Sequence, residues 1–174
     1  MNIFVAGIHG AGKTFLASRA APNVGLFHTS ASKLIREERT SQTWTSDKRV
    51  NDVDENQIAL AAAIKRHNEQ GIRLLLDGHF VLLDQEGEMI YLGADIFASL
   101  NLSGVLLVES DVRTVAQRIE ERDQRQVSLD HLQAFMEAER NQALKVCAEI
   151  NIPLTVLLAP SVEKFLASIN NLDI

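Results

Sequence analysis

The chain of 174 residues has 46% hydrophobic and 23% charged residues, which is the composition of an ordinary globular protein of about one domain. Its 17 Lys and Arg are outnumbered by 23 Asp and Glu, so the net charge of -6 excludes a general nucleic-acid coat protein, and no DNA partner is expected. No run approaches the roughly 20 apolar residues that cross a bilayer, and the N-terminus lacks a secretory pattern. We therefore expect a cytoplasmic protein with no membrane partner.

Neither a disulfide nor a histidine metal site is predicted. Cys147 is the only cysteine, which excludes a disulfide within the chain, and we expect it to fill space in the core. The histidines show no spacing typical of metal ligands. They are His9, His28, His67, His79 and His131.

Five short apolar runs predict β-strands. They are rich in leucine or β-branched residues and lack polar alternation, so we expect each strand to be buried on both faces. In chain order they cover residues 2–6, 25–29, 72–77, 104–109 and 153–158.

Segments with helical spacing separate these runs. They cover residues 13–20, 30–39, 52–70, 111–123, 128–149 and 161–170. Asp111, Ser128 and Ser161 are suited to cap the helices that they open, and Gly71 is suited to end the third helix. The buried stripe of the third helix is expected to hold Ile58, Ala61, Ala62 and Ile64.

Strand and helix alternate throughout the chain. This order predicts an α/β fold of three layers, in which helices flank a five-stranded parallel sheet, as a single domain over residues 1–174. Ligands bind to such a sheet at the carboxyl ends of its strands. The polar connection 40–54 contains Trp44, which we expect to pack against that segment in preference to stacking on a base.

The loop after the first strand carries the clearest motif. Residues 7–14 read Gly-Ile-His-Gly-Ala-Gly-Lys-Thr, a full match to the phosphate-binding P-loop pattern. The glycines let backbone N–H groups surround a phosphate, Lys13 is expected to bridge the outer phosphates, and Thr14 to place its hydroxyl on Mg²⁺. The predicted ATP phosphate-binding residues are Gly7, His9, Gly10, Ala11, Gly12, Lys13, Thr14 and Phe15. This motif predicts a P-loop NTPase fold.

The nucleotide is expected to be ATP. No Asn-Lys-x-Asp tetrapeptide, through which GTPases specify guanine, occurs in the sequence. The length of the chain favours a compact kinase or a small ATPase.

Beyond the P-loop, three segments resemble the adenylate kinase family and follow its order. Residues 27–36 resemble the segment that binds the phosphate acceptor, which implies acceptor contacts by Ser30 and Arg36. Residues 111–122 resemble the helix that leads into the kinase lid, which implies that Arg118 and Arg122 hold ATP.

The third segment, residues 74–79, is similar to the third strand of that family. The resemblance implies that Asp77 reaches Mg²⁺ through water, which makes Thr14 and Asp77 the predicted metal residues. A histidine two residues later, His79, is similar to archaeal-type adenylate kinases and to the adenylate kinase-like ATPases of ribosome assembly.

The sequence also departs from that family. His79-Phe80-Val81 replaces the usual Phe-Pro-Arg, so one phosphate-binding arginine is missing. The resemblance therefore does not determine the identity of the acceptor. The resemblance assigns an acceptor-binding lobe to residues 30–70 and a short lid to residues 122–128.

Together these features predict an ATP-dependent phosphotransferase that moves the γ-phosphoryl of Mg-ATP to a nucleoside monophosphate or a similarly small acceptor. The expected catalytic residues are Lys13, Asp77, His79, Arg118 and Arg122. The alternative is a slow ATPase that acts as a nucleotide-dependent switch for a protein or ribonucleoprotein partner. A nucleotide binder without turnover is disfavoured, because Lys13, Thr14 and Asp77 are all present.

Several of these side chains have structural alternatives. Asp77 could cap a turn, and His79 could be a structural residue. Arg118 and Arg122 could belong to a surface of ion pairs, and Arg39 could replace Arg36 as the acceptor residue.

Overall fold

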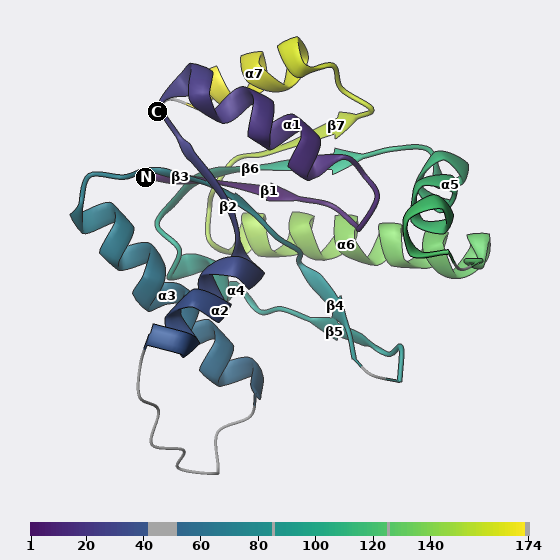
Figure 1. Ribbon diagram of the computed structural model, residues 1–174, viewed down its shortest axis with the longest axis horizontal. Coiled ribbons are helices and arrows are strands. Elements are labelled where there is room, and N and C mark those ends of the chain that lie inside the picture. The colour runs from purple at the N-terminus through teal and green to yellow at the C-terminus, as the bar shows by residue number, and fades with distance from the viewer. Residues whose placement is uncertain (42–51, 85, 125, 173–174) are drawn as a thin grey trace.

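The computed structural model describes residues 1–41, 52–84, 86–124 and 126–172. Its centre is a five-stranded parallel sheet in the order β2-β3-β1-β6-β7 (Figure 1). The strands are β1 Asn2–Ala6, β2 Phe27–Ser30, β3 Leu74–Asp77, β6 Leu102–Glu109 and β7 Leu154–Leu158. The predicted α/β fold with a five-stranded parallel sheet is confirmed.

Helices cover both faces of the sheet. In Figure 1, α1 (Lys13–Ala20) and α7 (Val162–Asn170) lie on one face, and α6 (Leu129–Glu149) lies on the other. The second face is also covered by α2 (Ala31–Ser41), α3 (Asp52–Glu69) and α4 (Ala94–Ala98), and α5 (Val112–Asp123) packs on α6. These layers form because successive strand residues point to opposite faces: Ile3 packs under α1 and α7, whereas Phe4 packs toward the other helices.

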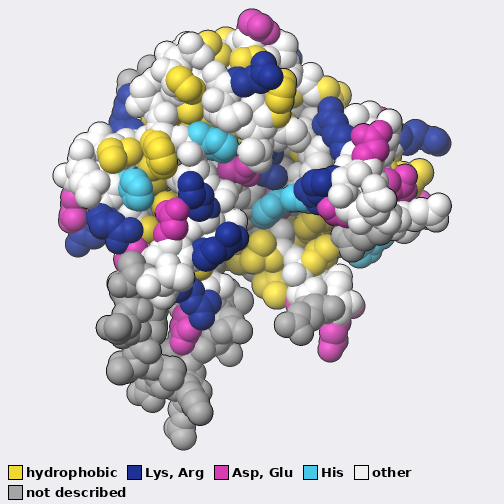
Figure 2. Space-filling view, viewed as in Figure 1, with side chains coloured by type: hydrophobic (Ala, Val, Ile, Leu, Met, Phe, Trp, Pro, Cys, Tyr) yellow, Lys and Arg dark blue, Asp and Glu magenta, His cyan; other side chains and the backbone are white. Residues whose placement is uncertain are grey.

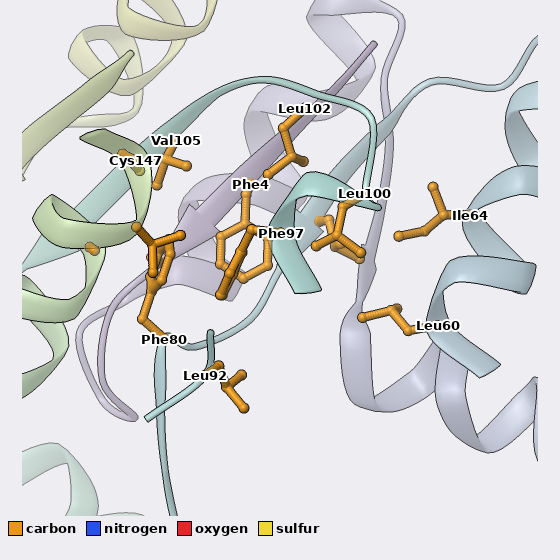
Figure 3. Close-up of a cluster of buried hydrophobic side chains, with 14 of the residues drawn as sticks. Phe4, Leu60, Ile64, Phe80, Leu92, Phe97, Leu100, Leu102, Val105 and Cys147 are labelled. Atoms are coloured by element: carbon orange, nitrogen blue, oxygen red, sulfur yellow. The ribbon is translucent and has the colours of Figure 1, made fainter. Parts of the chain in front are cut away.

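An aromatic cluster fills the second face beside the ends of β1 and β3. Phe4 meets Phe80 and Phe97 edge to face, with ring centroids 5.5 and 5.3 Å apart, while Phe80 and Phe97 stack at 4.1 Å (Figure 3). All three side chains are buried. The three rings therefore form part of the hydrophobic core between the sheet and the helices on its second face.

The predicted helix ends agree with the structure. Asp111 caps α5 by accepting from the amides of Arg113 and Thr114. Ser128 and Ser161 cap α6 and α7 in the same way. Gly71 follows α3 with a φ of 76°, and Cys147 is buried in the core.

Some predicted boundaries and burial patterns were wrong. The second strand starts at Phe27, because Gly25, with a φ of 63°, ends a 3₁₀ helix at Ala21–Val24. Ser30 ends β2, so the helix begins at Ala31. β2 and β7 are edge strands and are not buried on both faces, and Leu158 is 66% exposed.

The buried stripe of α3 was only partly predicted: Ile64 is buried as expected, whereas Ala61 and Ala62 are half-buried. Ile58 is 59% exposed, and the core-facing residues are Ala59, Leu60, Ala63 and Ile64. The antiparallel hairpin of β4 (Val81–Leu83) and β5 (Met89–Tyr91) and the short helix α4 were not predicted. Each of these elements is too short to show a hydrophobic periodicity in the sequence.

Two predicted segments are only partly described. The lobe over residues 30–70 includes α2 and α3, which pack on each other, but Trp44 lies outside the described residues. Residues 122–128 join α5 to α6, and Arg125 lies outside the described part. Among the described helices, none has the length and apolar character needed to cross a membrane.

Candidate functional site

The P-loop joins β1 to α1 and has a conformation that requires glycine. Gly7 has a φ of 137°, and a Cβ there would lie 2.2 Å from the carbonyl oxygen of Val108. Gly12 has a φ of 100° where it caps α1. The loop is therefore shaped by its glycines to expose backbone amides beside the positive end of a helix.

Lys13 is buried within this loop, with only 6% of its surface exposed. Its Nζ donates to the carbonyl oxygens of Gly7, at 2.6 Å, and Ile8, at 3.2 Å, and lies 3.7 Å from Asp77 Oδ1. Burial lowers the pKa of the Lys13 ammonium, although the charges of Asp77 and Glu139 oppose that effect. A cation is thus held where the phosphates of a nucleotide would meet it.

Thr14 and Asp77 come together across the ends of α1 and β3. Thr14 Oγ1 donates to Asp77 Oδ2 at 2.8 Å, and His28 Nε2 lies 3.9 Å from that same oxygen. Burial raises the pKa of Asp77, but the interactions with His28, Lys13 and Thr14 outweigh it, so the pKa lies below its usual value. Asp77 is therefore ionised at neutral pH.

The Thr14 hydroxyl and the Asp77 carboxylate fit a magnesium site. Both offer the hard oxygen ligands that Mg²⁺ prefers. Within the described ranges, no group of three or more His, Cys, Asp or Glu side chains could hold a metal ion.

His79 follows β3 and is held in its neutral form. Burial, followed by the positive charge of Lys13, lowers the pKa of His79 to about 3. Its Nδ1 is buried and has no hydrogen-bond partner in the part of the chain that the structure describes. An unpaired buried nitrogen is costly, which makes it a candidate for contact with a ligand.

Glu139 of α6 connects the P-loop to the segment after β3. It is 1% exposed, and its carboxylate accepts from the amides of Gly7 at 3.1 Å, Phe80 at 2.9 Å and Val81 at 2.7 Å. Burial raises the pKa of Glu139, and the three amides and Lys13 oppose that rise. One buried carboxylate thus fixes two loops that carry predicted site residues.

A cavity of 560 Å³ lies along the P-loop. Arg118 Nη1 donates to the Gly10 carbonyl oxygen at 3.0 Å, and the guanidinium of Arg122 binds the Asp123 carboxylate through two hydrogen bonds. The structure places both arginines and most of the predicted phosphate-binding residues on this cavity. Its lining is His9, Gly10, Ala11, Gly12, Lys13, Thr14, Phe15, Leu16, Ser110, Arg118, Arg122, Ala159 and Pro160.

A second cavity, of 440 Å³, opens on the other side of Thr14. Asp77, His79 and Ser30 line it, and Ser30 Oγ also accepts from the Lys33 amide at the start of α2. Arg36 is exposed on α2 and does not line the cavity. The sequence-predicted site residues are therefore brought together except for Arg36, whose role stays a prediction.

The two cavities meet at the same side chains. His9, Lys13 and Thr14 line both of them. Figure 2 shows a hollow near the middle of this face, where histidine, basic and acidic side chains gather above hydrophobic ones. A group bound in one cavity can therefore reach a group bound in the other.

Sequence reasoning missed three polar residues of this region. Glu139 stands on the buried face of α6 in line with Leu132 and Ala143, so a charge at an apolar position of the helical repeat was the available signal. His28 interrupts the apolar character of β2 in a similar way. Gln57 of α3 carried no signal, because its place on the second cavity depends on how α3 packs.

Comparison with known proteins gives a family match over most of the chain. Residues 6–135 match the family model described as AAA domain. No curated protein matches the sequence.

Solved structures share the fold at low identity. A gluconokinase from Sinorhizobium meliloti is 16% identical, with a TM-score of 0.57 over 98% of this chain and 92% of that chain. A sugar kinase from Janibacter sp. is 16% identical, with a TM-score of 0.55 over the same shares. A protein from Eubacterium ventriosum is 13% identical, with a TM-score of 0.55 over 98% of this chain and 97% of that chain. At these identities the likeness concerns the fold alone.

The buried carboxylate generates the first prediction. Glu139→Gln should lower the free energy of unfolding by about 2–4 kcal/mol, because the amides of Gly7, Phe80 and Val81 would share one neutral oxygen and face an NH₂ group. Denaturant unfolding measures this loss. The matched control is Glu137→Gln, on the exposed face of the same helix, which should change stability by less than about 0.5 kcal/mol. Equal effects of the two substitutions would contradict the connecting role of Glu139.

The second prediction concerns pH. Because the pKa of His79 is lowered to about 3 in the folded protein, the unfolded chain binds the proton more tightly. The contribution of neutral His79 to the free energy of unfolding is fully present above about pH 6.5 and is lost as the pH falls toward 3. Between about pH 7.5 and pH 5, the parent should lose roughly 1–2 kcal/mol more than His79→Gln. The exposed His131→Gln control should behave as the parent, and identical pH profiles for all three proteins would refute the prediction.

Proposed function

The chain belongs to the AAA domain family, and from this premise we propose that it is an ATP-dependent phosphotransferase. It binds Mg-ATP in the cavity along the P-loop and transfers the γ-phosphoryl group to a small acceptor in the second cavity. One observation carries the proposal: Lys13, Thr14 and His9 line both cavities. The terminal phosphate of a nucleotide on the P-loop would therefore lie at the boundary with the acceptor.

In this proposal the amides of residues 10–14 hold the phosphates of ATP at the start of α1. Lys13 exchanges its bonds with the Gly7 and Ile8 carbonyl oxygens for bonds with phosphate oxygens. Arg118 and Arg122 lie on the same cavity and add positive charge beside the phosphates. Catalysis then consists of positioning and charge stabilisation, without a covalent intermediate.

Thr14 and Asp77 would hold the magnesium ion, Thr14 by its hydroxyl and Asp77 through water. When bound there, Mg²⁺ would neutralise charge on the β and γ phosphates. The protein contributes an ionised carboxylate and a hydroxyl that already lie 2.8 Å apart. His79 on the acceptor side is neutral, so it adds no positive charge to the second cavity.

If the protein is of an adenylate kinase-like subtype, its acceptor is a nucleoside monophosphate or a molecule of similar size. In this subtype residues 30–70 form the acceptor-binding lobe, with Ser30 and Arg36 as its contacts, and residues 122–128 act as a short lid. Ser30 supports the assignment because it lines the second cavity. The lid would exclude water from the transfer.

A slow ATPase that switches a protein partner is the second candidate. It is favoured by the position of Arg36, which is exposed and away from the second cavity. The two candidates differ in their products. A phosphotransferase forms ADP faster than it releases free phosphate once its acceptor is present, whereas an ATPase forms both at equal rates with every acceptor.

Nucleotide binding generates the third prediction. Saturating Mg-ATP, at about a hundred times its dissociation constant, should stabilise the parent by about 2.7 kcal/mol and raise its Tm by roughly 5–10 °C. Lys13→Ala should remove most of that rise. Lys65→Ala, a change on the exposed side of α3, is the control and should keep it. A Tm that does not respond to Mg-ATP in the parent would refute the nucleotide site.

Turnover generates the fourth prediction. Asp77→Asn should keep the Kd for ATP within about threefold, because the phosphate-binding loop is intact, and should lower kcat by roughly a hundredfold or more. Calorimetry measures the first quantity and ADP formation the second. The exposed Asp130→Asn should leave both unchanged. Turnover near that of the parent in Asp77→Asn would make Asp77 a structural cap.

A further inference from the structure

We propose that Glu139 is a positioning residue for phosphoryl transfer, because it holds the P-loop at a fixed separation from the wall of the second cavity. The inference rests on the proposed phosphotransfer and adds to it a residue that acts from outside both cavities. Glu139 belongs to α6, which lies on the second face of the sheet (Figure 1), and it lines neither the cavity along the P-loop nor the second cavity. It therefore acts on turnover through the groups that it binds.

On the nucleotide side, Glu139 binds the first residue of the P-loop. Its Oε1 accepts from the Gly7 amide at 3.1 Å, and the carbonyl oxygen of the same glycine accepts from Lys13 Nζ at 2.6 Å. The backbone of Gly7 packs closely on β6, since a Cβ at this position would lie 2.2 Å from the Val108 carbonyl oxygen. The carboxylate thus fixes the residue that holds the Lys13 ammonium.

On the acceptor side, Glu139 binds two successive amides after β3. Phe80 donates to Oε2 at 2.9 Å, and Val81 donates to the same oxygen at 2.7 Å. Both residues lead into the wall of the second cavity. The Phe80 ring stacks at 4.1 Å on Phe97, which lines the cavity, and Leu82, which follows Val81, lines it too. A shift of the two amides would therefore move this wall.

Gln142, one helical turn after Glu139, gives a comparison within the same helix. Its Nε2 donates to the carbonyl oxygen of Leu92 at 2.6 Å, and Leu92 lines the second cavity. The Leu92 amide in turn donates to the Phe80 carbonyl oxygen at 2.9 Å. Glu139 and Gln142 thus hold the two ends of the β4–β5 hairpin. In the part of the chain that the structure describes, Glu139 is the one of the two that is also bonded to the P-loop.

The carboxylate suits this role because it is buried and offers two oxygens. Glu139 is 1% exposed, so water does not readily replace a bond that is lost. Glu139→Gln would leave one oxygen for three amides and turn an NH₂ group toward them, so the P-loop and the wall could not both keep their places. A misplacement of about 1 Å can cost roughly a hundredfold in rate. The loss is therefore expected in kcat more than in nucleotide binding.

The experiment starts by finding a working acceptor for the parent. ADP formation from Mg-ATP is measured with AMP, CMP, GMP, UMP, adenosine and gluconate, each against the rate without an acceptor, and the fastest acceptor is kept. ADP formation that none of them raises would count against the proposed phosphotransfer itself and would overturn the inference with it.

With this acceptor, Glu139→Gln should lower kcat by about thirtyfold or more and change the Kd for ATP by less than about threefold. The control is Ile169→Ala on α7, which removes a fully buried side chain on the opposite face of the sheet and should cost a comparable amount of stability. Ile169→Ala should keep kcat within about twofold of the parent, at a temperature at which circular dichroism shows all variants folded. A parent-like kcat in Glu139→Gln, or an equal loss in both variants, would overturn the inference and leave the phosphotransferase standing.

Two further variants keep the test decisive if Glu139→Gln does not fold. Glu139→Asp retains the charge but is one methylene shorter, so it cannot reach both loops and should lower kcat about tenfold. Gln142→Met removes the bond to Leu92 and should raise the KM for the acceptor about fivefold, with the Kd for ATP unchanged. A parent-like kcat in Glu139→Asp, or equal losses of ATP and acceptor binding in Gln142→Met, would overturn the inference.

Discussion

Two loops that are far apart in the sequence meet at the carboxylate of Glu139, which accepts amide hydrogen bonds from Gly7, Phe80 and Val81. The parallel pairing of β1 and β3, with Val5 opposite Asp77, brings these loops to the same edge of the sheet. Glu139 then fixes the start of the P-loop against the segment that carries His79. The distance between the lysine of the nucleotide side and the carboxylate of the acceptor side depends on this arrangement.

The arrangement also explains the charge states of the site. Lys13, Asp77 and Glu139 are all buried, and a buried charge is tolerated only with partners of opposite charge or with hydrogen bonds. Each of the three has such partners within the site itself. Burial, followed by the charge of Lys13, keeps His79 neutral, and its Nδ1 has no hydrogen-bond partner among the described residues. A site built this way concentrates fixed charge at the boundary of the two cavities and leaves the acceptor side largely apolar.

Much of this organisation could be predicted from the sequence. The alternation of strand and helix led to the α/β fold, because apolar runs and helical repeats are local patterns, and the P-loop motif located Lys13 and Thr14 beside the first strand. Asp77 was identified through the resemblance of residues 74–79 to the third strand of the adenylate kinase family. The edge positions of β2 and β7 were missed, since the order of strands in a sheet depends on pairing between distant segments.

The acceptor side was the least predictable part. Gln57 and the β4–β5 hairpin contribute to the second cavity only through tertiary packing, which no local pattern records. Arg36 was inferred from the resemblance of residues 27–36 to the acceptor-binding segment of the adenylate kinase family, and the structure places that residue on the exposed side of α2. A rotation of one position along a helix, about 100°, separates Ile35 on the cavity from Arg36 outside it.

The most direct test of the account is a crystal structure with Mg²⁺ and a non-hydrolysable ATP analogue. We expect the triphosphate on the amides of residues 10–14, with the terminal phosphate bonded to Lys13 Nζ and facing Asp77 across the boundary of the two cavities. The metal should lie on Thr14 Oγ1. A nucleotide bound in the second cavity, or a terminal phosphate that points toward Ser110 and Pro160, would contradict it.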